Sequence, residues 1–362
     1  ILLYIIDLCT GDCVCYFIRN VNDKTHGIVA RKRRTIIKGI KMKISKLLTL
    51  ITGIGLIVFG IISSNLYFLQ VIQMIIINAI LALGLNLIFG HTGQISIGQA
   101  GFYAIGAYTS AILEVKLGIS FLLAWPSAII LTAIIAAIIG IPILKLHGHY
   151  LAMATMAFAM IVETIATNWI FITGGHAGIY VPTENVLGSF ISSKIYFITV
   201  IVGILLYIIC ENIEYSRVGR ALRAVREDED GASSIGIKHS KYKVIMFVVG
   251  AIFSAIAGII YVHLNSVITP EVFNLDTSIL ILMMVIVGGI GSNIGVVLGS
   301  VFITLLPEFL YGFLEYNILI YGILICSSLI FLPQGLYGLI MHVMETIKKL
   351  IYYNYKIKNE GE

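Results

Sequence analysis

The sequence predicts an all-α membrane protein, a bundle of about eight to ten transmembrane helices. Of its 362 residues, 59% are hydrophobic and only 12% are charged, about half the charge of an ordinary soluble chain. Apolar runs of about 18 residues or more, enough to cross a hydrocarbon core, recur from Lys46 almost to the end. Backbone polar groups within such runs must be satisfied internally, so the runs form helices rather than a barrel of short alternating segments.

The expected helices form two groups, separated by one long polar stretch. Before it we expect helices at 47–64, 67–89, 98–116, 119–144, 149–172 and 194–212. After it we expect helices at 243–266, 277–311 and 316–333. The run 277–311 is too long for one straight span, and its centre, Gly288–Asn293, is rich in glycine, a poor helix former. A broken or re-entrant helix pair is therefore expected there.

The positions of the basic residues predict the topology and the domain limits. Of the 24 lysines and arginines, ten precede the first helix, seven lie in 211–243 and four follow residue 347. Cytoplasmic loops are enriched in basic residues, so both termini and the 211–243 loop are expected in the cytoplasm. The transmembrane domain is then 42–347, followed by a cytoplasmic tail, 348–362.

Residues 1–41 differ in kind from the rest of the chain. They are polar, hold three of the five cysteines and end near a basic run, Arg31–Arg34, whereas Met42 leads directly into an apolar helix. We expect translation to begin at Met42 and 1–41 to be an extension outside the domain. The cysteine spacing fits neither a disulfide framework nor a zinc site.

Patterns typical of enzymes are absent from the sequence. It contains no G-x-x-x-x-G-K-[ST] phosphate loop, so we expect no ATP binding and no cofactor in this chain. No Ser/His/Asp set, metal-ligand cluster or channel filter repeat is visible either. With enzyme and channel patterns absent, we expect the protein to function in transport.

The 211–243 loop carries the most specific pattern. Arg220, Arg223 and Arg226 follow one another at intervals of three residues, so they share one face of a helix. An acidic cluster, Glu227–Asp230, comes next, and then small residues that permit close approach of another surface. Charge alone is also compatible with a solvated connector.

The stretch 90–101 is glycine-rich and places Gln94, Ser96 and Gln99 at membrane depth. Non-helical backbone is tolerated there only where it is buried in protein or lines a wet cavity. Transporters bind solutes at such helix breaks, although glycine and serine also serve close helix packing. Glu163 is the only acidic residue in the middle of its helix, and it is a candidate either for function or for pairing within the bundle.

These segments resemble a known family, the permeases of bacterial ABC importers for branched-chain amino acids. The loop residues that match the family's ATPase-coupling segment are Gly219, Arg220, Ala224, Val225, Arg226, Glu227, Asp228, Ala232, Gly236 and Ile237. Asn86–Phe102, Thr173–Gly178 and Gly288–Ser292 resemble its other motifs in the same order. The Thr173–Gly178 loop resembles the larger permease of the pair. Asp230 and Gly231 depart from the usual pattern and make the loop more polar.

The resemblance implies a multi-pass subunit of an ATP-driven importer for branched-chain or other small amino acids, in the bacterial cytoplasmic membrane. It implies a second permease subunit, two ATPase subunits that hold ATP–Mg, an extracytoplasmic solute-binding protein, and no nucleic acid. The residues expected to form the ATPase-coupling loop are Gly219, Arg220, Arg223, Arg226, Glu227, Asp228, Ala232 and Gly236. The candidates for the solute pathway are Asn86, Gln94, Ser96, Gln99, Glu163, Thr173, Gly174, Gly175, Gly289 and Ser292.

Two alternatives stay open. One is a stand-alone secondary transporter driven by an ion gradient, with Glu163 as its coupling carboxylate. The other is an ABC permease for urea or short amides. Dependence on an ATPase distinguishes the first alternative, since a stand-alone carrier has no use for a coupling loop.

Overall fold

A computed structural model confirms the helical membrane protein that the sequence predicts. It describes residues 49–62, 65–181, 191–309, 322 and 335–339. Five described helices are long and apolar enough to cross a membrane, and the shorter helices Thr49–Ile62, Leu275–Gly288 and Asn293–Glu308 are also apolar. The segments 1–41 and 348–362 lie outside the described residues, as does the expected helix 316–333 apart from Gly322. The side of the membrane on which the termini lie stays a prediction.

The helices before the polar loop follow the expected order. After the helix Thr49–Ile62 come α4 (Leu66–Thr92), α5 (Gln99–Val115), α6 (Phe121–Ile143), α7 (His149–Asn168) and α10 (Ile191–Tyr215). The predicted helix 149–172 is interrupted. The backbone leaves the helical region at Trp169 (φ −87°, ψ 61°), and the short helix α8 (Ile170–Thr173) and 3-10 turn η1 (Gly175–Ala177) follow.

The polar loop contains two short helices rather than a simple connector. They are α11 (Arg217–Glu227) and α12 (Glu229–Ser234). The next helix, α13 (His239–Asn265), begins four residues before its predicted start. Lys243, one turn into this helix, forms an ion pair with Glu229 of α12, so the loop is tied to the start of α13.

The long run after α13 is broken, as predicted. A 3-10 turn η2 (Pro270–Phe273) leads to α14 (Leu275–Gly288), and α15 (Asn293–Phe309) follows. Between them Gly289 and Gly291 have φ of 119° and 86°, which other residues rarely adopt. Two short strands, β1 (Ile179–Tyr180) and β2 (Val267–Ile268), pair antiparallel with Ile179 opposite Ile268.

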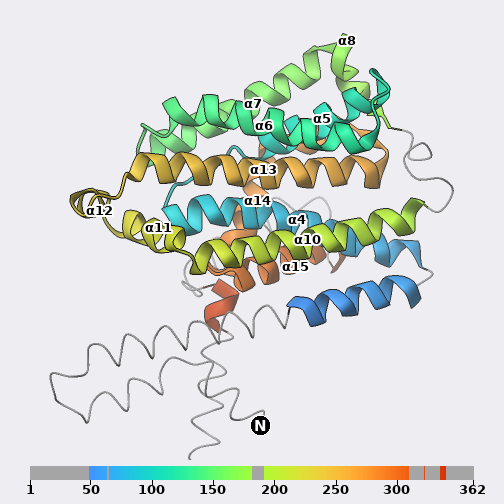
Figure 1. Cartoon of the computed structure of the whole chain (residues 1–362). Helices are drawn as coiled ribbons and strands as arrows, with labels where there is room; N and C mark the ends of the chain where they lie inside the picture. The colour runs from blue at the N-terminus through green and yellow to red at the C-terminus, as the bar shows by residue number, and fades with distance from the viewer. Residues whose placement is uncertain (1–48, 63–64, 182–190, 310–321, 323–334, 340–362) are drawn as a thin grey trace, which may run out of the picture.

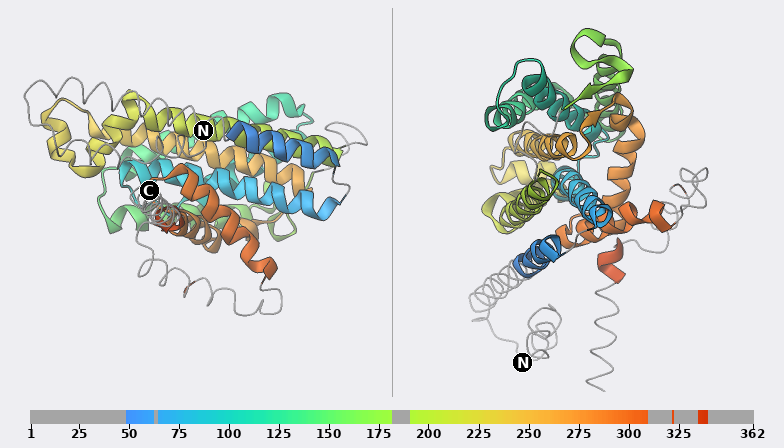
Figure 2. Two further views of the ribbon diagram at one scale, coloured as in Figure 1. Left: turned by 90° about the horizontal axis from the view of Figure 1, so that it is seen from below. Right: turned by 90° about the vertical axis from the view of Figure 1, so that its right-hand side faces the viewer.

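The long helices run alongside one another, with α13 near the centre (Figure 1). It packs against α5 and α6 on one side and α4 on the other, as the end-on view of Figure 2 also shows. Small residues permit this approach, because a Cβ on Gly106 of α5 would lie 2.5 Å from Ala255 Cα. The second half of α4, from Ala79 to Ile88, is buried throughout and forms the core.

The two ends of the bundle carry different elements. We call the end with α11 and α12 the loop end, and the end with β1 and β2 the strand end (Figure 1). The connection between α4 and α5 and the break between α14 and α15 lie close to α11, at the loop end.

Candidate functional site

The centre of the candidate site is α11, a short amphipathic helix at the loop end. The Ser216 hydroxyl accepts the Gly219 N–H at 3.2 Å and so caps its first turn. Leu222 and Val225 are buried against the bundle, whereas Arg220 and Glu227 are exposed. The predicted arginine face therefore exists, but it is divided between solvent and the bundle.

Arg226 joins α11 to the end of α4. Its guanidinium donates to the carbonyl oxygen of Gly90. Gly90 in turn lies against the second helix break, because a Cβ on Gly90 would collide with the Asn86 side chain and lie 2.7 Å from Gly291 N. A Cβ on Gly291 would lie 3.1 Å from Arg226 Nη1. Glycine at both positions therefore makes room for one arginine between two helix breaks.

A second set of hydrogen bonds connects the same elements through asparagines. Asn86 of α4 donates to Asn293 Oδ1 at 3.0 Å and accepts the Gly291 N–H at 2.9 Å. Asn293 donates to the Glu214 carboxylate at the end of α10, at 2.9 Å. Arg223 donates to the Glu214 carbonyl at 3.3 Å. The ends of α4 and α10, the start of α15 and α11 are thus one hydrogen-bonded unit, which we call the loop-end network.

The remaining loop residues have mostly internal roles. Asp228 accepts the Asp230 N–H at 3.0 Å and caps α12, and Ala232 is buried. Gly219 is buried where a Cβ would collide with the Glu214 carbonyl, and Gly236 turns the chain with φ 84°. The residue that sequence reasoning missed is Ile235, which is 73% exposed at the tip of the loop. Its signal was an apolar residue directly after the small and polar residues of the loop.

The predicted break at 90–101 lies between α4 and α5 and is buried. Gln94, Ser96 and Gln99 are 4%, 1% and 0% exposed. Both amide atoms of Gln94, and Nε2 of Gln99, have no hydrogen-bond partner in the described part of the protein. A buried amide without a partner is costly, so these atoms mark a place where a further polar group would be stabilising.

Two serines not predicted from the sequence complete this region. Ser254 of α13 donates to the Gln99 side-chain oxygen, and Ser278 of α14 accepts the Ala100 N–H at 3.1 Å. The start of α5 is therefore held by polar contacts from two other helices. Isolated serines in apolar runs were the available signal, but serine is common in packed membrane helices.

The other predicted pathway residues lie elsewhere or have local roles. Glu163 is half-buried on α7 and has no ion pair among the described residues. Thr173 donates to the Ala166 carbonyl at 2.6 Å, and Gly174 and Gly175 turn the chain at the strand end, away from α11 (Figure 1). Ser292 caps α15 by accepting the Gly295 N–H at 3.1 Å. Gly289 is buried in the break itself, and only the Gly289–Ser292 pair adjoins the loop-end network.

Comparison with known proteins agrees with this arrangement. The family model described as branched-chain amino acid transport system, permease component, matches residues 67–329. That range includes both helix breaks and the whole 211–243 loop. The chain belongs to this permease family. The family predicted from the sequence motifs is therefore confirmed.

The chain is also similar in sequence to individual members of the permease family. The chain is 32% identical to the permease protein LivM of Salmonella typhimurium over 293 residues, 74% of this chain and 69% of that protein. It is 30% identical to a probable LivM of Methanocaldococcus jannaschii, over 71% of this chain and 89% of that protein. Identity to LivH of Salmonella typhimurium is 26%, over 72% and 91%. No solved structure matches.

Proposed function

We propose that this permease is the membrane-spanning subunit of an ATP-driven importer in the bacterial cytoplasmic membrane, and that it moves branched-chain or other small amino acids. A second permease, two ATPase subunits that hold ATP–Mg, and an extracytoplasmic solute-binding protein would complete the assembly. The LivM and LivH relatives, both named as parts of branched-chain amino acid transport systems, support the pairing and the solute class.

The observation that carries the proposal is the placement of α11. A helix at the surface of the loop end is hydrogen-bonded through Arg226 to Gly90, next to the break between α14 and α15. A movement of α11 would therefore be passed through the Arg226 side chain to the segments at both helix breaks. A stand-alone carrier would have no need for a surface helix connected to the helix breaks in this way.

The exposed residues of the loop supply a surface for the ATPase. Arg220 and Glu227 present both signs of charge, and Ile235 presents an apolar side chain that is 73% exposed. An exposed apolar residue with a charged rim is typical of a protein interface. Arg226 instead transmits the movement inward, and Asp228, Gly219 and Ala232 shape the loop.

The solute pathway is proposed to pass the break between α4 and α5. The unpartnered amides of Gln94 and Gln99 offer donors and an acceptor in a buried setting. Closure of the two ATPases on ATP would shift α11 and with it the ends of α4 and α14. The backbone at the two breaks would then change between states open to either side, as in other transporters with discontinuous helices.

A test begins with the tagged full chain in gentle detergent, purified from native membranes and analysed by mass spectrometry. The expected result is recovery of an ATPase, a second permease and a binding protein, and ATP-dependent uptake after reconstitution. Ile235→Asp should lose the ATPase while the second permease stays bound. Ser234→Asp, also exposed on the loop, is the matched variant and should retain the ATPase.

Recovery of the chain alone, with solute uptake driven by an ion gradient and no ATPase, would overturn the proposal. It would favour the ion-coupled carrier. If the ATPase is recovered but the binding protein retains urea or a short amide, the solute class is wrong and the importer stands.

A further inference from the structure

The helices α12 and α13 are joined by side-chain contacts where the polar loop returns to the bundle. Glu229 of α12 forms an ion pair with Lys243 of α13, and the Ser233 hydroxyl lies 2.9 Å from His239 Nδ1. Each helix contributes two residues that are four apart, and such residues lie on one face of a helix. The loop is therefore held to the start of α13 at two points, one helical turn apart.

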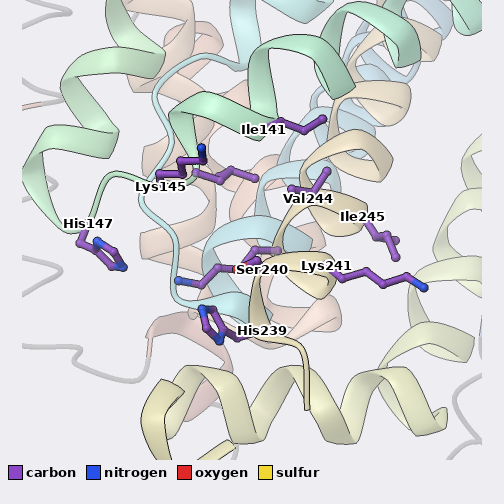
Figure 3. Close-up of a pocket in the computed structure, with 10 residues that line it drawn as sticks. Ile141, Lys145, His147, His239, Ser240, Lys241, Val244 and Ile245 are labelled. Atoms are coloured by element: carbon purple, nitrogen blue, oxygen red, sulfur yellow. The ribbon is translucent and has the colours of Figure 1, made fainter. Parts of the chain in front are cut away.

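Lys243 depends on Glu229 to stabilise its charge. The two side chains are 6% and 36% exposed, so the ammonium group is buried, and Lys243 forms no other ion pair among the described residues. Lys243 also lines a cavity of about 540 Å³ between the last turn of α6 and the first turns of α13 (Figure 3). The lining residues are lysines, histidines, a serine and apolar residues, with no acid among them. Because a buried charge is costly unless it is paired, Glu229 holds the Lys243 side chain in place.

One face of α13 extends from this ion pair to the break between α4 and α5. Four buried residues follow one another at intervals of three or four, the spacing of one helical face, namely Lys243, Phe247, Gly250 and Ser254. The Phe247 ring packs edge-on against Phe102 of α5 with centroids 5.4 Å apart, and a Cβ on Gly250 would lie 2.8 Å from the Gly84 carbonyl oxygen of α4. Ser254 donates to the side-chain oxygen of Gln99. A movement of the start of α13 would therefore be passed to Gln99, the first residue of α5.

The polar loop is thus connected to both sides of the break between α4 and α5. Arg226 of α11 donates to the carbonyl oxygen of Gly90, which lies before the break. Glu229, three residues later, is connected through α13 to Gln99, which lies after the break. If the loop moves as one body, the two sides of the break are displaced by different helices and so change their relative position.

We infer that Glu229 and Lys243 are positioning residues for transport, and that their ion pair passes the movement of the loop to α13 and so to Gln99. The inference rests on the proposed function, since the ATPases would supply the movement. Packed side chains, ion pairs and rigid helices of this kind carry coupling between distant sites. Arg226 acts on the end of α4 and the ion pair acts on the start of α5, so both connections are needed for the break to change its conformation.

The test compares solute uptake with ATP hydrolysis by the full assembly in liposomes. Glu229→Gln/Lys243→Met removes both charges, so no unpaired charge stays buried and the melting temperature should change little. The amount of solute moved per ATP should fall about tenfold, because hydrolysis continues while α13 no longer follows the loop. Glu229→Lys/Lys243→Glu restores the pair with reversed charges and should recover this ratio to within about threefold of the unchanged protein, whereas Glu229→Lys alone should not.

The matched control is Asp230→Asn/Lys241→Met, which removes an exposed acid and an exposed lysine next to the ion pair in sequence. It should move as much solute per ATP as the unchanged assembly does. An equal loss in this control would overturn the inference, since the charge of the region and not the ion pair would then matter.

Two further outcomes separate coupling from stability. If Glu229→Gln/Lys243→Met moved the normal amount of solute per ATP, the ion pair would serve stability alone and the inference would be wrong. If that variant melted earlier, and the reversed pair recovered the melting temperature without recovering solute per ATP, the inference would be wrong as well. An unchanged assembly without ATP-driven uptake would instead overturn the proposed function, and the inference with it.

Discussion

The two ends of the bundle are built on different principles. At the loop end, side chains from α10 and α11 bond to glycine-rich breaks, and the bonds run between elements distant in sequence. At the strand end, the chain is closed by the pairing of β1 with β2 and by contacts within a buried cluster. The loop end thus contains broken helices, whereas the strand end is held together by strand pairing and buried contacts.

The buried cluster at the strand end centres on His263. Its Nδ1 faces the Ile259 carbonyl at 2.7 Å and its Nε2 faces the Glu114 carboxyl at 3.0 Å, and the Trp125 ring packs edge-on at 5.2 Å between centroids. Both ring nitrogens of His263 therefore face oxygen atoms. The pair is almost fully buried, with side chains 1% and 8% exposed. A buried cluster that joins α5 and α13 in this way is expected to hold still while the loop end moves.

The largest effect is expected from filling the space between the two breaks. In Gly90→Val, the added atoms would collide with Asn86 and approach the Gly291 N–H, so Arg226 would lose its place. Overpacking of this kind costs about 1–3 kcal/mol or more, and we expect uptake in proteoliposomes below about 1% of the unchanged protein. Gly55→Val is the control, because a Cβ there meets nothing within 4 Å. Normal uptake by Gly90→Val would contradict the proposed connection between α11 and the two helix breaks.

Removing the arginine itself should have a smaller effect. Arg226→Ala deletes the donor to the Gly90 carbonyl, and a hydrogen bond from a charged group contributes about 1.5–3 kcal/mol. Uptake should fall about 10- to 100-fold while ATP hydrolysis continues, because the proposed contacts with the ATPase are made by other residues. Arg217→Ala, an exposed arginine on the same helix, should transport normally. If ATP hydrolysis and uptake fell together, Arg226 would contact the ATPase itself and would not act through Gly90.

Asn293→Ala should lower uptake less than Arg226→Ala does, because Asn293 bonds to Asn86 and Glu214 and not to α11; its effect falls mainly on stability. Asn293→Ala leaves Asn86 and Glu214 each without one partner, at a cost of about 1–3 kcal/mol for each unsatisfied buried group. We expect uptake to fall about tenfold and the protein to unfold at a lower temperature. Asn265→Ala, with an exposed side chain at the strand end, provides the comparison. Equal melting temperatures for the two variants would show that the network stabilises nothing.

The fold class and the breaks followed from the sequence because they depend on local composition. Long apolar runs predicted the helices, and glycine clusters predicted the interruptions near Gly93 and at Gly289–Ser292. The partners of the network could not be predicted, because Asn86 and Asn293 are 207 residues apart and Asn293 and Glu214 are 79 apart. A single sequence gives no record of which distant polar residues meet.

The orientation of α11 relative to the bundle could not be predicted from the sequence either. The three-residue spacing of Arg220, Arg223 and Arg226 predicted a shared face, but packing of Leu222 decides which way that face is turned. The result is that Arg220 and Arg226 are both exposed, but only Arg226 donates a hydrogen bond to the Gly90 carbonyl at the end of α4. The tertiary contact, not the helical period, distinguishes Arg226 from Arg220.

At the strand end, a mutation should lower stability without lowering transport. Glu114→Ala removes the carboxyl that His263 faces and leaves a buried ring nitrogen unpaired, which costs about 1–3 kcal/mol. The melting temperature in detergent should fall, while uptake per folded molecule stays within about twofold. Glu271→Ala, an exposed acidic residue near η2, should change neither. A selective loss of uptake in Glu114→Ala would show that the strand end also moves during transport.

The smallest effect is expected from Glu163→Gln, and it separates the importer from the ion-coupled carrier. The side chain is half-buried on α7, and no described residue forms an ion pair with it. Glutamine keeps its size and loses its charge, so ATP-driven uptake should stay within about twofold of the unchanged protein. An ion-coupled carrier would instead lose uptake entirely, because the neutral amide cannot exchange a proton or pair with a cation. Uptake measured with ATP, and then with an imposed proton or sodium gradient, gives opposite results for the two mechanisms. A gradient-dependent loss in this one variant would transfer the coupling role from α11 to α7.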